Sequence, residues 1–373
     1  MKKRISDICQ VINGRAYKQN ELLQQGKYRV LRVGNFFTSD KWYYSDFELA
    51  EDKYCDKGDL LFAWSATFGP KIWDGEKVIY HYHIWKMIPD VSVVDKWYLY
   101  YWLKKNVSNI TAGVHGSVMA HITKSEMENF EIDIPPLRIQ QVVASILRAI
   151  DDKIRNNKAI NDNLLQQARA LYKDRFIDLT PFDGSMPSDW HLGTVSEIIE
   201  LHDSKRIPLS SRERAELDKI YPYYGATSVM DYVDRYLFDG IYLLLGEDGT
   251  VVDGQGFPIL QYVEGKFWVN NHAHIITGKN GFTVEMLYLL FSLTNVQSIV
   301  TGAVQPKISQ ANLNKVPVVI PSKTELTAFD ESIQPFFAEI RNLRTENDRL
   351  VSVRDSLLPR LMSGELDVPD LDL

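Results

Sequence analysis

The sequence predicts an α+β protein with two globular α/β domains joined by two long helices, which we expect to pack as an antiparallel coiled coil with pseudo-two-fold symmetry. Two observations predict this fold. The first is an internal repeat, because GSVMAHIT from Gly116 matches GAVQPKIS from Gly302 with Gly, Val and Ile at the same places. The second is a heptad pattern of apolar residues after each copy. Two copies of so long a unit indicate a duplicated half-molecule rather than a solenoid.

The repeat continues without a gap beyond these two stretches. Pro135 falls on Pro321 at the same offset of 186 positions that separates Gly116 from Gly302. Further matched pairs are Met127 and Leu313, Ile134 and Ile320, Ile154 and Ile340, Leu164 and Leu350, and Leu171 and Leu357. The match therefore extends from the loop through the whole of the following helix.

The second helix carries the clearer heptad seam. Its positions alternate in spacings of four and three: Phe329, Ile333, Phe336, Ile340, Leu343, Asn347, Leu350, Arg354 and Leu357. Such a seam over about four heptads is typical of a coiled coil. Ser322 and Glu325 form a capping-box pattern at its start. Pro359 is expected to end or kink the helix, with Gly364 as a later stop.

The first helix carries the same seam at the repeat offset. Its positions are Val143, Leu147, Ile150, Ile154, Asn157, Asn161, Leu164, Ala168 and Leu171. Pro136 opens this helix and the break comes before Pro181. Asn161 and Asn347 are equivalent, and they are either exposed polar residues or a buried polar pair that fixes the register. Roughly 37 helical residues at about 1.5 Å each make a rod of about 55 Å. A tandem duplication suits antiparallel packing of two such rods.

The remaining segments define the two globular domains. The predicted boundaries are 1–135 for the first domain, 136–180 for the first helix, 181–321 for the second domain, and 322–373 for the second helix and tail. Strands rich in β-branched and aromatic residues are expected at 28–37, 59–64, 77–88, 240–246, 257–263 and 266–277. Each domain also begins with a short amphipathic stretch and contains an aromatic-rich helix, at 97–105 and 285–293. The domains share this layout but diverge in sequence far more than the helices do.

Composition excludes several classes of protein. The chain of 373 residues is 45% hydrophobic and 24% charged, which is ordinary globular composition. Its two cysteines suit a reducing compartment, and we find neither a signal peptide nor a transmembrane segment. We therefore expect a cytoplasmic protein with no membrane partner. The net charge of −7, with the acidic excess after residue 180, means that a DNA-binding role would need a partner for most of the phosphate neutralisation.

A few residue patterns could form catalytic or metal sites, and each also has a simpler structural interpretation. We find no phosphate-binding loop, nucleophile elbow or methyltransferase cofactor loop, and expect no metal. Asp253 with Glu264 and Lys266 resembles a nuclease metal site, or is a hairpin turn with solvated charges. His81 with His83 and His272 with His274 each share a strand face, as two metal ligands would, or have a hydrogen-bonding role.

Two loop stretches favour DNA binding. Residues 32–44 and 221–232 combine Arg, Asn, Ser, Thr and Tyr with glycines, and such side chains can bond base edges or phosphates. The alternative is an aromatic core edge with a polar loop. The repeat loops themselves offer either backbone clamps or simple turn residues. The candidate DNA-binding residues are Arg32, Asn35, Lys41, Tyr43, Tyr44, Ser117, Tyr223, Tyr224, Thr227, Ser228, Asn271, His272, Gln305 and Lys307.

This order of domains and helices resembles a known family. The two repeat loops before proline-capped helices, together with the tail LLPRLMSGEL, look like the specificity subunit of type I restriction-modification systems. The stretches at 223–252 and 269–276 also resemble target-recognition domains of that family. One departure is that the first domain starts almost at Met1, without the longer lead seen at 189–198.

The resemblance implies a phage-defence protein without catalytic activity of its own. Each of two target-recognition domains would read one half of a bipartite, asymmetric target in double-stranded DNA. The helices would set the spacer and dock two modification subunits, which bring S-adenosylmethionine, and two restriction subunits would complete the complex. No cofactor is expected on this chain. The alternatives are a stand-alone metal-dependent nuclease that uses Asp253, Glu264 and Lys266, or an acidic protein-binding scaffold.

Overall fold

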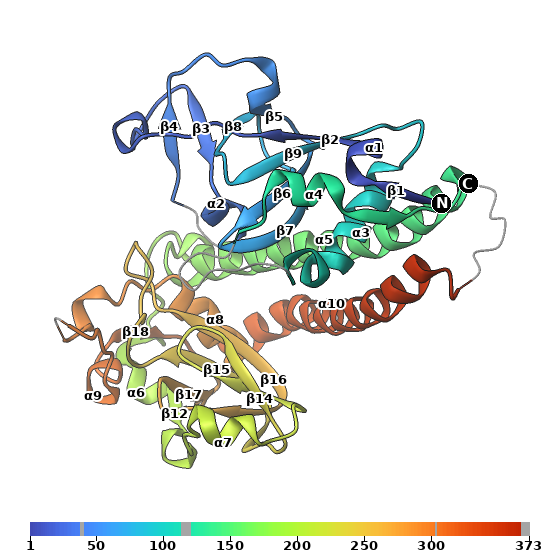
Figure 1. The fold of residues 1–373 in the computed structure, drawn as a ribbon. Helices are drawn as coiled ribbons and strands as arrows, with labels where there is room; N and C mark the ends of the chain where they lie inside the picture. Colours follow the sequence, from blue (N-terminus) through green and yellow to red (C-terminus); the bar gives the residue numbers. More distant parts are fainter. Residues whose placement is uncertain (38–40, 113–120, 303, 367–373) are drawn as a thin grey trace. The chain divides into compact units, whose positions relative to one another are not determined.

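The chain folds into two units that share its two long helices. The computed structural model describes residues 1–37, 41–112, 121–302 and 304–366 (Figure 1). Unit 1 comprises Met1–Asn156 with Glu346–Leu373, and unit 2 comprises Asn157–Thr345. Helices α5 (Leu137–Phe176) and α10 (Lys323–Ser363) therefore each contribute one half to each unit.

Unit 1 contains two four-stranded sheets. Their strand orders are β2-β9-β6-β7 and β4-β3-β8-β5. The strands are β1 (Lys2–Arg4), β2 (Cys9–Asn13), β3 (Tyr28–Leu31), β4 (Tyr43–Ser45), β5 (Tyr54–Cys55), β6 (Leu60–Ser65), β7 (Thr67–Ile72), β8 (Val78–Tyr80), β9 (Ile84–Pro89) and β10 (Glu131–Asp133). The helices besides α5 and α10 are α1 (Ile5–Ile8), α2 (Val33–Phe37), α3 (Lys96–Thr111) and α4 (Lys124–Asn129). Asp95 caps α3 by accepting from the backbone N–H groups of Trp97 and Tyr98.

The main core of unit 1 lies under helix α3. Phe62 and Trp85 from the sheet pack with Tyr98 of α3, and Leu147 of α5 and Leu361 of α10 belong to the same cluster. We call the part of each unit outside α5 and α10 its head. The head and the helix pair of unit 1 therefore share one hydrophobic core.

Unit 2 contains one six-stranded sheet with the order β12-β17-β15-β16-β13-β14. The strands are β11 (His191–Thr194), β12 (Ile199–Leu201), β13 (Tyr221–Tyr224), β14 (Val229–Val233), β15 (Phe238–Gly246), β16 (Leu260–Val269), β17 (Ala273–Gly278) and β18 (Pro317–Ile320). The helices are α6 (Val195–Ile198), α7 (Ser211–Ala215), α8 (Val284–Ser292) and α9 (Gln310–Leu313). Leu243, Leu287 and Phe291 pack with Tyr172 of α5 and Ile333 of α10 in the core. Again head and helices share a core.

The two heads have the same kinds of secondary structure at their beginning and end. Each begins with a short strand and a one-turn helix, and each ends with a strand that pairs antiparallel with the first: β1 with β10, and β11 with β18. Lys3 is opposite Ile132, and Gly193 is opposite Val318. Ile132 and Val318 are equivalent at the repeat offset, so the duplication extends from the helices into this strand pair.

The helices run antiparallel within each unit, as the fold class requires. In unit 1, an Arg354 guanidinium nitrogen lies 2.7 Å from an Asp151 carboxylate oxygen. In unit 2, Arg175 near the end of α5 forms an ion pair with Glu325 near the start of α10. Helix α5 begins directly after Pro136, and the Ser322 hydroxyl accepts from the Glu325 N–H over 3.4 Å, as the capping pattern predicted.

The predicted seam is correct at most positions and shifted by one residue at Leu171, Phe336 and Leu357. Leu171 is 43% exposed and Tyr172 is buried instead, while Phe337 is buried in place of the partly exposed Phe336. A 3.6-residue helix drifts from a strict heptad, and these helices also bury a face against the heads. Leu358, next to the seam position Leu357, is likewise buried in the core of unit 1.

Two further expectations about the helices can be settled. Pro359 does not end α10, which continues to Ser363 before Gly364 takes a φ of +73°. Burial of Leu361 in the core holds this last turn. Asn161 and Asn347 are each 8% exposed, so the alternative of solvent-exposed seam residues is wrong.

Most predicted strands are present, with changed bounds. The stretch 28–37 is a strand only to Leu31 and then forms α2, and 77–88 contains two strands. Strand β16 spans the end of 257–263 and the start of 266–277, and β17 begins only at Ala273. The aromatic-rich helices are α3 and α8. Within the described ranges, no helix is long and apolar enough to span a bilayer.

Candidate nucleic-acid interface

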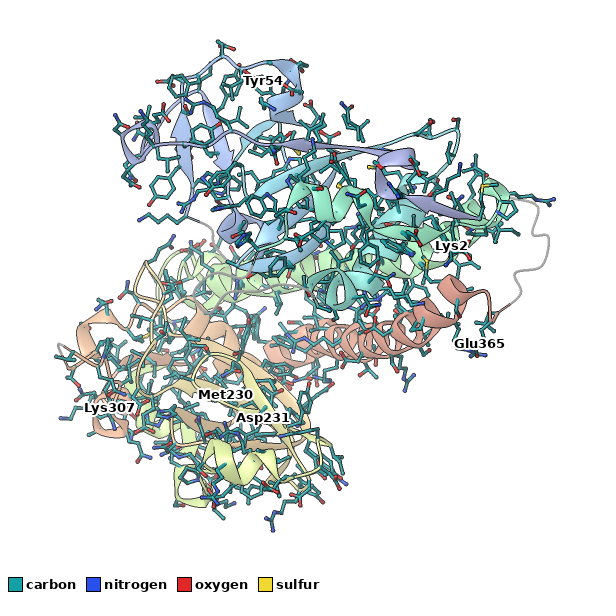
Figure 2. All side chains as sticks on the ribbon, viewed as in Figure 1. Lys2, Tyr54, Met230, Asp231, Lys307 and Glu365 are labelled. Atoms are coloured by element: carbon teal, nitrogen blue, oxygen red, sulfur yellow. The ribbon has the colours of Figure 1, made fainter. Side chains whose placement is uncertain are left out.

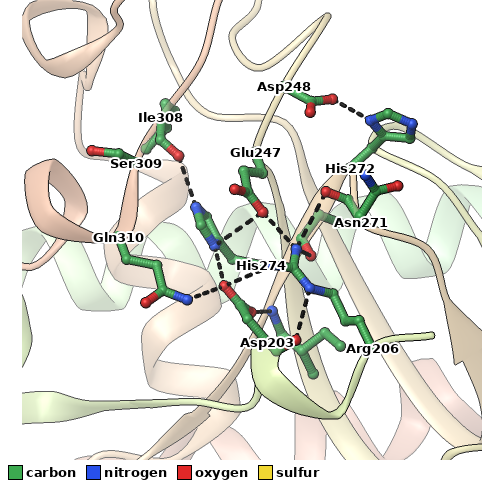
Figure 3. A network of polar contacts seen from close by, with 12 residues as sticks. Asp203, Arg206, Glu247, Asp248, Asn271, His272, His274, Ile308, Ser309 and Gln310 are labelled. Carbon is green, nitrogen blue, oxygen red and sulfur yellow. Dashed lines mark hydrogen bonds and ion pairs between the residues drawn. The ribbon is translucent and has the colours of Figure 1, made fainter. Parts of the chain in front are cut away.

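A polar network with a buried centre lies at the end of strand β15 in unit 2, and we call it the Asp203 network (Figure 3). Its members come from separate elements and are Asp203, Arg206, Glu247, His274, Lys307 and Gln310. Asp203 follows β12, Glu247 follows β15, and His274 lies in β17. Sheet topology brings them together, because Leu245 of β15 is directly opposite His274.

His274 is the centre of this network and is fully buried. Its Nδ1 lies 2.6 Å from an Asp203 carboxylate oxygen, and its Nε2 lies 2.8 Å from the Ile308 carbonyl oxygen. A carbonyl oxygen only accepts, so Nε2 carries a proton. The imidazole therefore joins the sheet to the loop before α9.

Asp203 is satisfied on both oxygens. One accepts from the Ile275 N–H over 2.9 Å, and the other also accepts from the Gln310 side chain over 2.5 Å. Burial by itself raises the pKa of Asp203, but the bonds from His274, Ile275 and Gln310 outweigh it and leave that pKa below its usual value. The carboxyl is therefore an anion.

Glu247 is held between two cations. Arg206 approaches one of its oxygens to 2.5 Å and Lys307 the other to 3.1 Å. Burial raises the pKa of Glu247, and the contacts with Arg206, His274 and Lys307 lower it more strongly. Asp203, Glu247 and His274 have three possible metal-ligand atoms within 4.8 Å of one another. Since the same atoms already bind protein cations and amides, we interpret the cluster as an ion-pair network.

The repeat loop is attached to this network through its backbone. The Ile308 N–H donates to the Glu247 carbonyl over 2.9 Å, and the Gly249 N–H donates to the Pro306 carbonyl over 2.9 Å. Two predicted residues lie on this loop: Gln305 is exposed, and Lys307, which is seen at the surface in Figure 2, is half-exposed. Ser117, from the first copy of the loop, lies outside the described residues.

The other predicted residues of unit 2 divide between surface and core. Asn271 and His272 lie in the turn before β17, where His272 pairs with Asp248. Thr227 and Ser228 are exposed at the tip of the β13–β14 hairpin. Tyr224 is half-buried, whereas Tyr223 is buried and its hydroxyl accepts from the Leu209 N–H over 3.0 Å. The structure thus places the side chain of Tyr223 in the core rather than on a DNA-facing surface.

In unit 1 the predicted residues gather around α2 and β4. The Arg32 guanidinium lies 4.9 Å from the centre of the Tyr43 ring. The Asn35 amide donates to the Lys41 carbonyl over 2.8 Å, and Tyr44 is half-buried in β4. Arg32, Asn35, Lys41 and Tyr43 therefore form one local cluster.

The histidine pair of unit 1 adjoins this cluster and differs from that of unit 2. Burial lowers the pKa of His81 to about 4, and His83 and Arg32 add to this effect. Burial and then Arg32 also lower the pKa of His83. Both rings are therefore neutral at pH 7.

The three residues of the nuclease hypothesis have other contacts. The Asp253 carboxylate accepts the N–H groups of Gln255 and Phe257 within its own turn. Glu264 lies 3.4 Å from the Arg341 guanidinium, and the Lys266 ammonium lies over the Tyr236 ring. Asp253 is a turn residue, but Glu264 and Lys266 lie within strand β16 and have separate partners, so they are not the solvated charges of a hairpin turn.

Sequence reasoning missed the core of the Asp203 network. It noted His274 but none of its partners, since Asp203 and Glu247 are far from it in the chain and no spacing marks them. It also missed the aromatic neighbours of His83, although Tyr82 lies within the HYH motif that it singled out.

Comparison with known proteins identifies the family. A model of the type I restriction modification DNA specificity domain matches the chain twice, over residues 1–166 and 187–350. The MjaIX specificity subunit of Methanocaldococcus jannaschii is 27% identical over 313 residues, which cover 76% of this chain and 72% of that one. The MjaVIII specificity subunit of the same organism is 22% identical over 354 residues, with 85% and 81% covered.

The fold agrees with this match. The crystal structure of a type I restriction-modification S subunit from M. genitalium superposes with a TM-score of 0.60 at 17% identity, and covers 100% of this chain and 96% of that one. This chain belongs to the family of type I restriction-modification DNA specificity proteins. Its activity is DNA target recognition, and it is not an enzyme by itself.

Proposed function

We propose that this chain is the subunit that gives a type I restriction-modification complex a bipartite, asymmetric DNA target, with one half-site read by each head. The observation that carries the proposal is the contrast within the duplication. The repeat loops, strands β10 and β18 and the long helices match at one offset, whereas the heads carry different sheets on that common frame. Different heads suit different half-sites, and matching helices suit two copies of one partner.

The helix pair offers a surface for such a partner. A groove in unit 2 is lined by Gln167, Ala170, Leu171, Lys173, Asp174, Asp178 and Phe336. Among the seam positions, Leu171 and Phe336 line this groove, and the packing leaves both at least partly exposed. Two modification subunits would bind along the helices and bring S-adenosylmethionine, and two restriction subunits would complete the complex. The modification subunits would also supply positive charge, which this chain with its net charge of −7 lacks.

Exchange of the first head tests independent reading. Residues 1–135 would be replaced by the corresponding head of another family member, and methylated sites would be mapped in cells that also express the modification partner. We expect one half of the target to change and the other half and the gap to stay. A change in both halves would contradict the proposal that each head reads one half-site by itself.

An insertion in the helix tests the proposed spacer role. Four residues added after Asn156 lengthen α5 by about 6 Å and rotate its far end by roughly 40°. At about 3.4 Å per base pair, the gap between unchanged half-sites should grow by one or two base pairs. The control inserts the same four residues after Gly184, in the exposed connection beyond α5, and should leave the gap unchanged. An unchanged gap with full methylation in the helix variant would show that the helices do not set the spacer.

A further inference from the structure

Four aromatic side chains gather at the end of strand β6 in unit 1, and we call them the aromatic patch: Trp64, Tyr82, His83 and His121. The centre of the Trp64 ring lies 5.8 Å from that of Tyr82, 5.2 Å from His83 and 6.5 Å from His121. The Trp64 indole N–H donates to the Tyr82 carbonyl over 2.6 Å, which fixes the indole ring. Tyr82 is 36% exposed and His121 is also exposed, so the patch reaches the surface.

The aromatic patch occupies the same place in its head as the Asp203 network does in the other. The Ile122 N–H donates to the Trp64 carbonyl, as the Ile308 N–H donates to the Glu247 carbonyl. His121 forms an antiparallel β-bridge with Ser65, just as Lys307 does with Asp248. His121 and Lys307 are equivalent at the repeat offset. In both heads, therefore, the repeat loop crosses the end of a central strand.

The side chains at these two equivalent places differ in chemical type. The end of β15 carries Lys307, Arg206 and two carboxylates, whereas the aromatic patch consists of rings and no carboxylate. The pKa of His83 is lowered by burial and by Arg32, so its ring stays neutral near pH 7. Arg32 is a fixed charge near the patch, and it lowers the pKa of both His81 and His83.

Aromatic rings at a surface suit the apolar parts of nucleic acid. Aromatic side chains stack on bases or contact the methyl group of thymine, and such contacts release no counterions. A lysine that neutralises a phosphate does release them, so its contribution falls as salt rises. The two equivalent places should therefore differ in the salt dependence of what they contribute.

We propose that the aromatic patch, with Tyr82 and His121 at its surface, is a base-contacting site through which the first head reads its half of the DNA target by apolar and stacking contacts. The proposal rests on the proposed function, because it needs one half-site to be read by each head. It adds residues that carry specificity in the first head and a mode of contact that differs from that of the second.

The test measures the affinity of the complex with its modification subunits for its mapped target at several salt concentrations. Tyr82→Ala and His121→Ala should each weaken binding by about tenfold, within the range expected for loss of one base–aromatic contact. Neither should change the slope of log K against log salt concentration. Lys307→Gln should lower that slope by about one. Both patch variants should lose discrimination between base substitutions in one half-site only.

Two matched variants control for folding and for the kind of contact. Ile88→Ala removes a side chain of similar exposure, 41%, on the far end of β9 and should bind within about twofold of the wild type. Tyr82→Phe keeps the ring and should also bind within about twofold, so it gives an answer even if Tyr82→Ala unfolds. Equal losses in Tyr82→Phe and Tyr82→Ala, wild-type affinity in both alanine variants, or a lowered salt slope in them would each overturn the proposal. A wild-type complex with no bipartite target would instead contradict the proposed function itself.

Discussion

The ends of strands β6 and β15 show how one backbone frame can carry two different surfaces. Each end receives a repeat loop by the same kind of main-chain bond, from Ile122 in unit 1 and from Ile308 in unit 2. Around β6 the side chains are aromatic rings, and around β15 they are charged groups in a network with a buried centre. In this molecule the loop position is fixed by backbone bonds, while the side chains at the strand ends are free to differ.

The largest expected effect is on the buried network. Replacement of Asp203 by Ala leaves His274, Gln310 and the Ile275 N–H without their acceptor, and the site is only 7% exposed. Breaking a buried pair from one side typically costs about 3–5 kcal/mol. We expect a loss of that size in the free energy of unfolding, measured by denaturant titration of the full chain. Hydrogen exchange of β17 would assign the loss to unit 2.

A small loss of stability in Asp203→Ala would contradict this prediction. A loss below about 1 kcal/mol in Asp203→Ala would mean that the network adds nothing to stability beyond a surface contact. The two strand ends would then differ in charge but not in how firmly they are held.

The second prediction uses pH to separate the units. The pKa of His81 falls from 6.5 to about 4 on folding, because burial disfavours its charged form. The stability this shift represents is complete above pH 6.5 and is lost as the pH falls from there towards 4, since the unfolded chain takes up the proton first. It amounts to at most about 3 kcal/mol, and solvent screening at this partly exposed ring lowers it.

The Asp203 network of unit 2 should respond in a different pH range, whereas His202 of the same unit, whose pKa burial also lowers, shares the range of His81. The pKa values of Asp203 and Glu247 are lowered on folding, so their contribution persists until the pH drops below the usual range of free carboxyl groups. Hydrogen exchange between pH 7 and 5, corrected for the intrinsic rate at each pH, should show protection falling in β8 and β9 before it falls in β15, whose end carries Glu247. Loss of protection in both units together would contradict the assignment to His81.

The third prediction concerns how the aromatic patch is ordered. Trp64→Phe removes the indole N–H that donates to the Tyr82 carbonyl and keeps a ring at the same place. One hydrogen bond is worth about 1 kcal/mol net, so unit 1 should lose about that much stability. Thermal melting of the full chain, with Trp64→Leu as a variant that also removes the ring, measures it. A loss in Trp64→Phe equal to that in Trp64→Leu would show that the indole bond, and not ring packing, holds the patch.

A feature could be predicted from the sequence when the pattern that encodes it is local in the chain. The seam from Phe329 to Asn347 was largely predictable, because a heptad is a local pattern and the fold satisfies it locally. The prediction that Leu171 and Phe336 are buried in the seam was wrong, because each helix also packs one face against a head. A heptad pattern does not encode that second packing face. The surface cluster of Arg32 and Tyr43 lies within one stretch of sequence, so it too could be found.

The Asp203 network could not be predicted in the same way. Asp203, Glu247 and His274 lie on three elements, and they meet only because β12 and β15 both pair with β17. A single sequence does not contain that strand order. The aromatic patch has the same origin, since Trp64 meets His121 through the crossing of the repeat loop over β6. Sequence analysis could therefore name the loops but not the partners that the sheets supply.

The smallest expected effect comes from a second Asp–His pair in unit 2. Asp248 pairs with His272 in the turn before β17, and these two side chains are 17% and 42% exposed, against 4% and 0% for Asp203 and His274. The residue types are the same, so exposure is the main difference between the pairs. A solvated pair is screened and typically contributes about 0–1 kcal/mol.

Asp248→Asn keeps the shape of the side chain and a hydrogen-bonding group while it removes the charge. We expect the free energy of unfolding to change by less than about 0.5 kcal/mol in the same denaturant titration that shows several kcal/mol for Asp203→Ala. The difference would show that burial, and not the type of contact, makes the Asp203 network the support of the loop that carries Lys307. If Asp248→Asn instead costs more than about 2 kcal/mol, the turn before β17 holds this strand end, and the contrast between the ends of β6 and β15 has to be drawn from that turn.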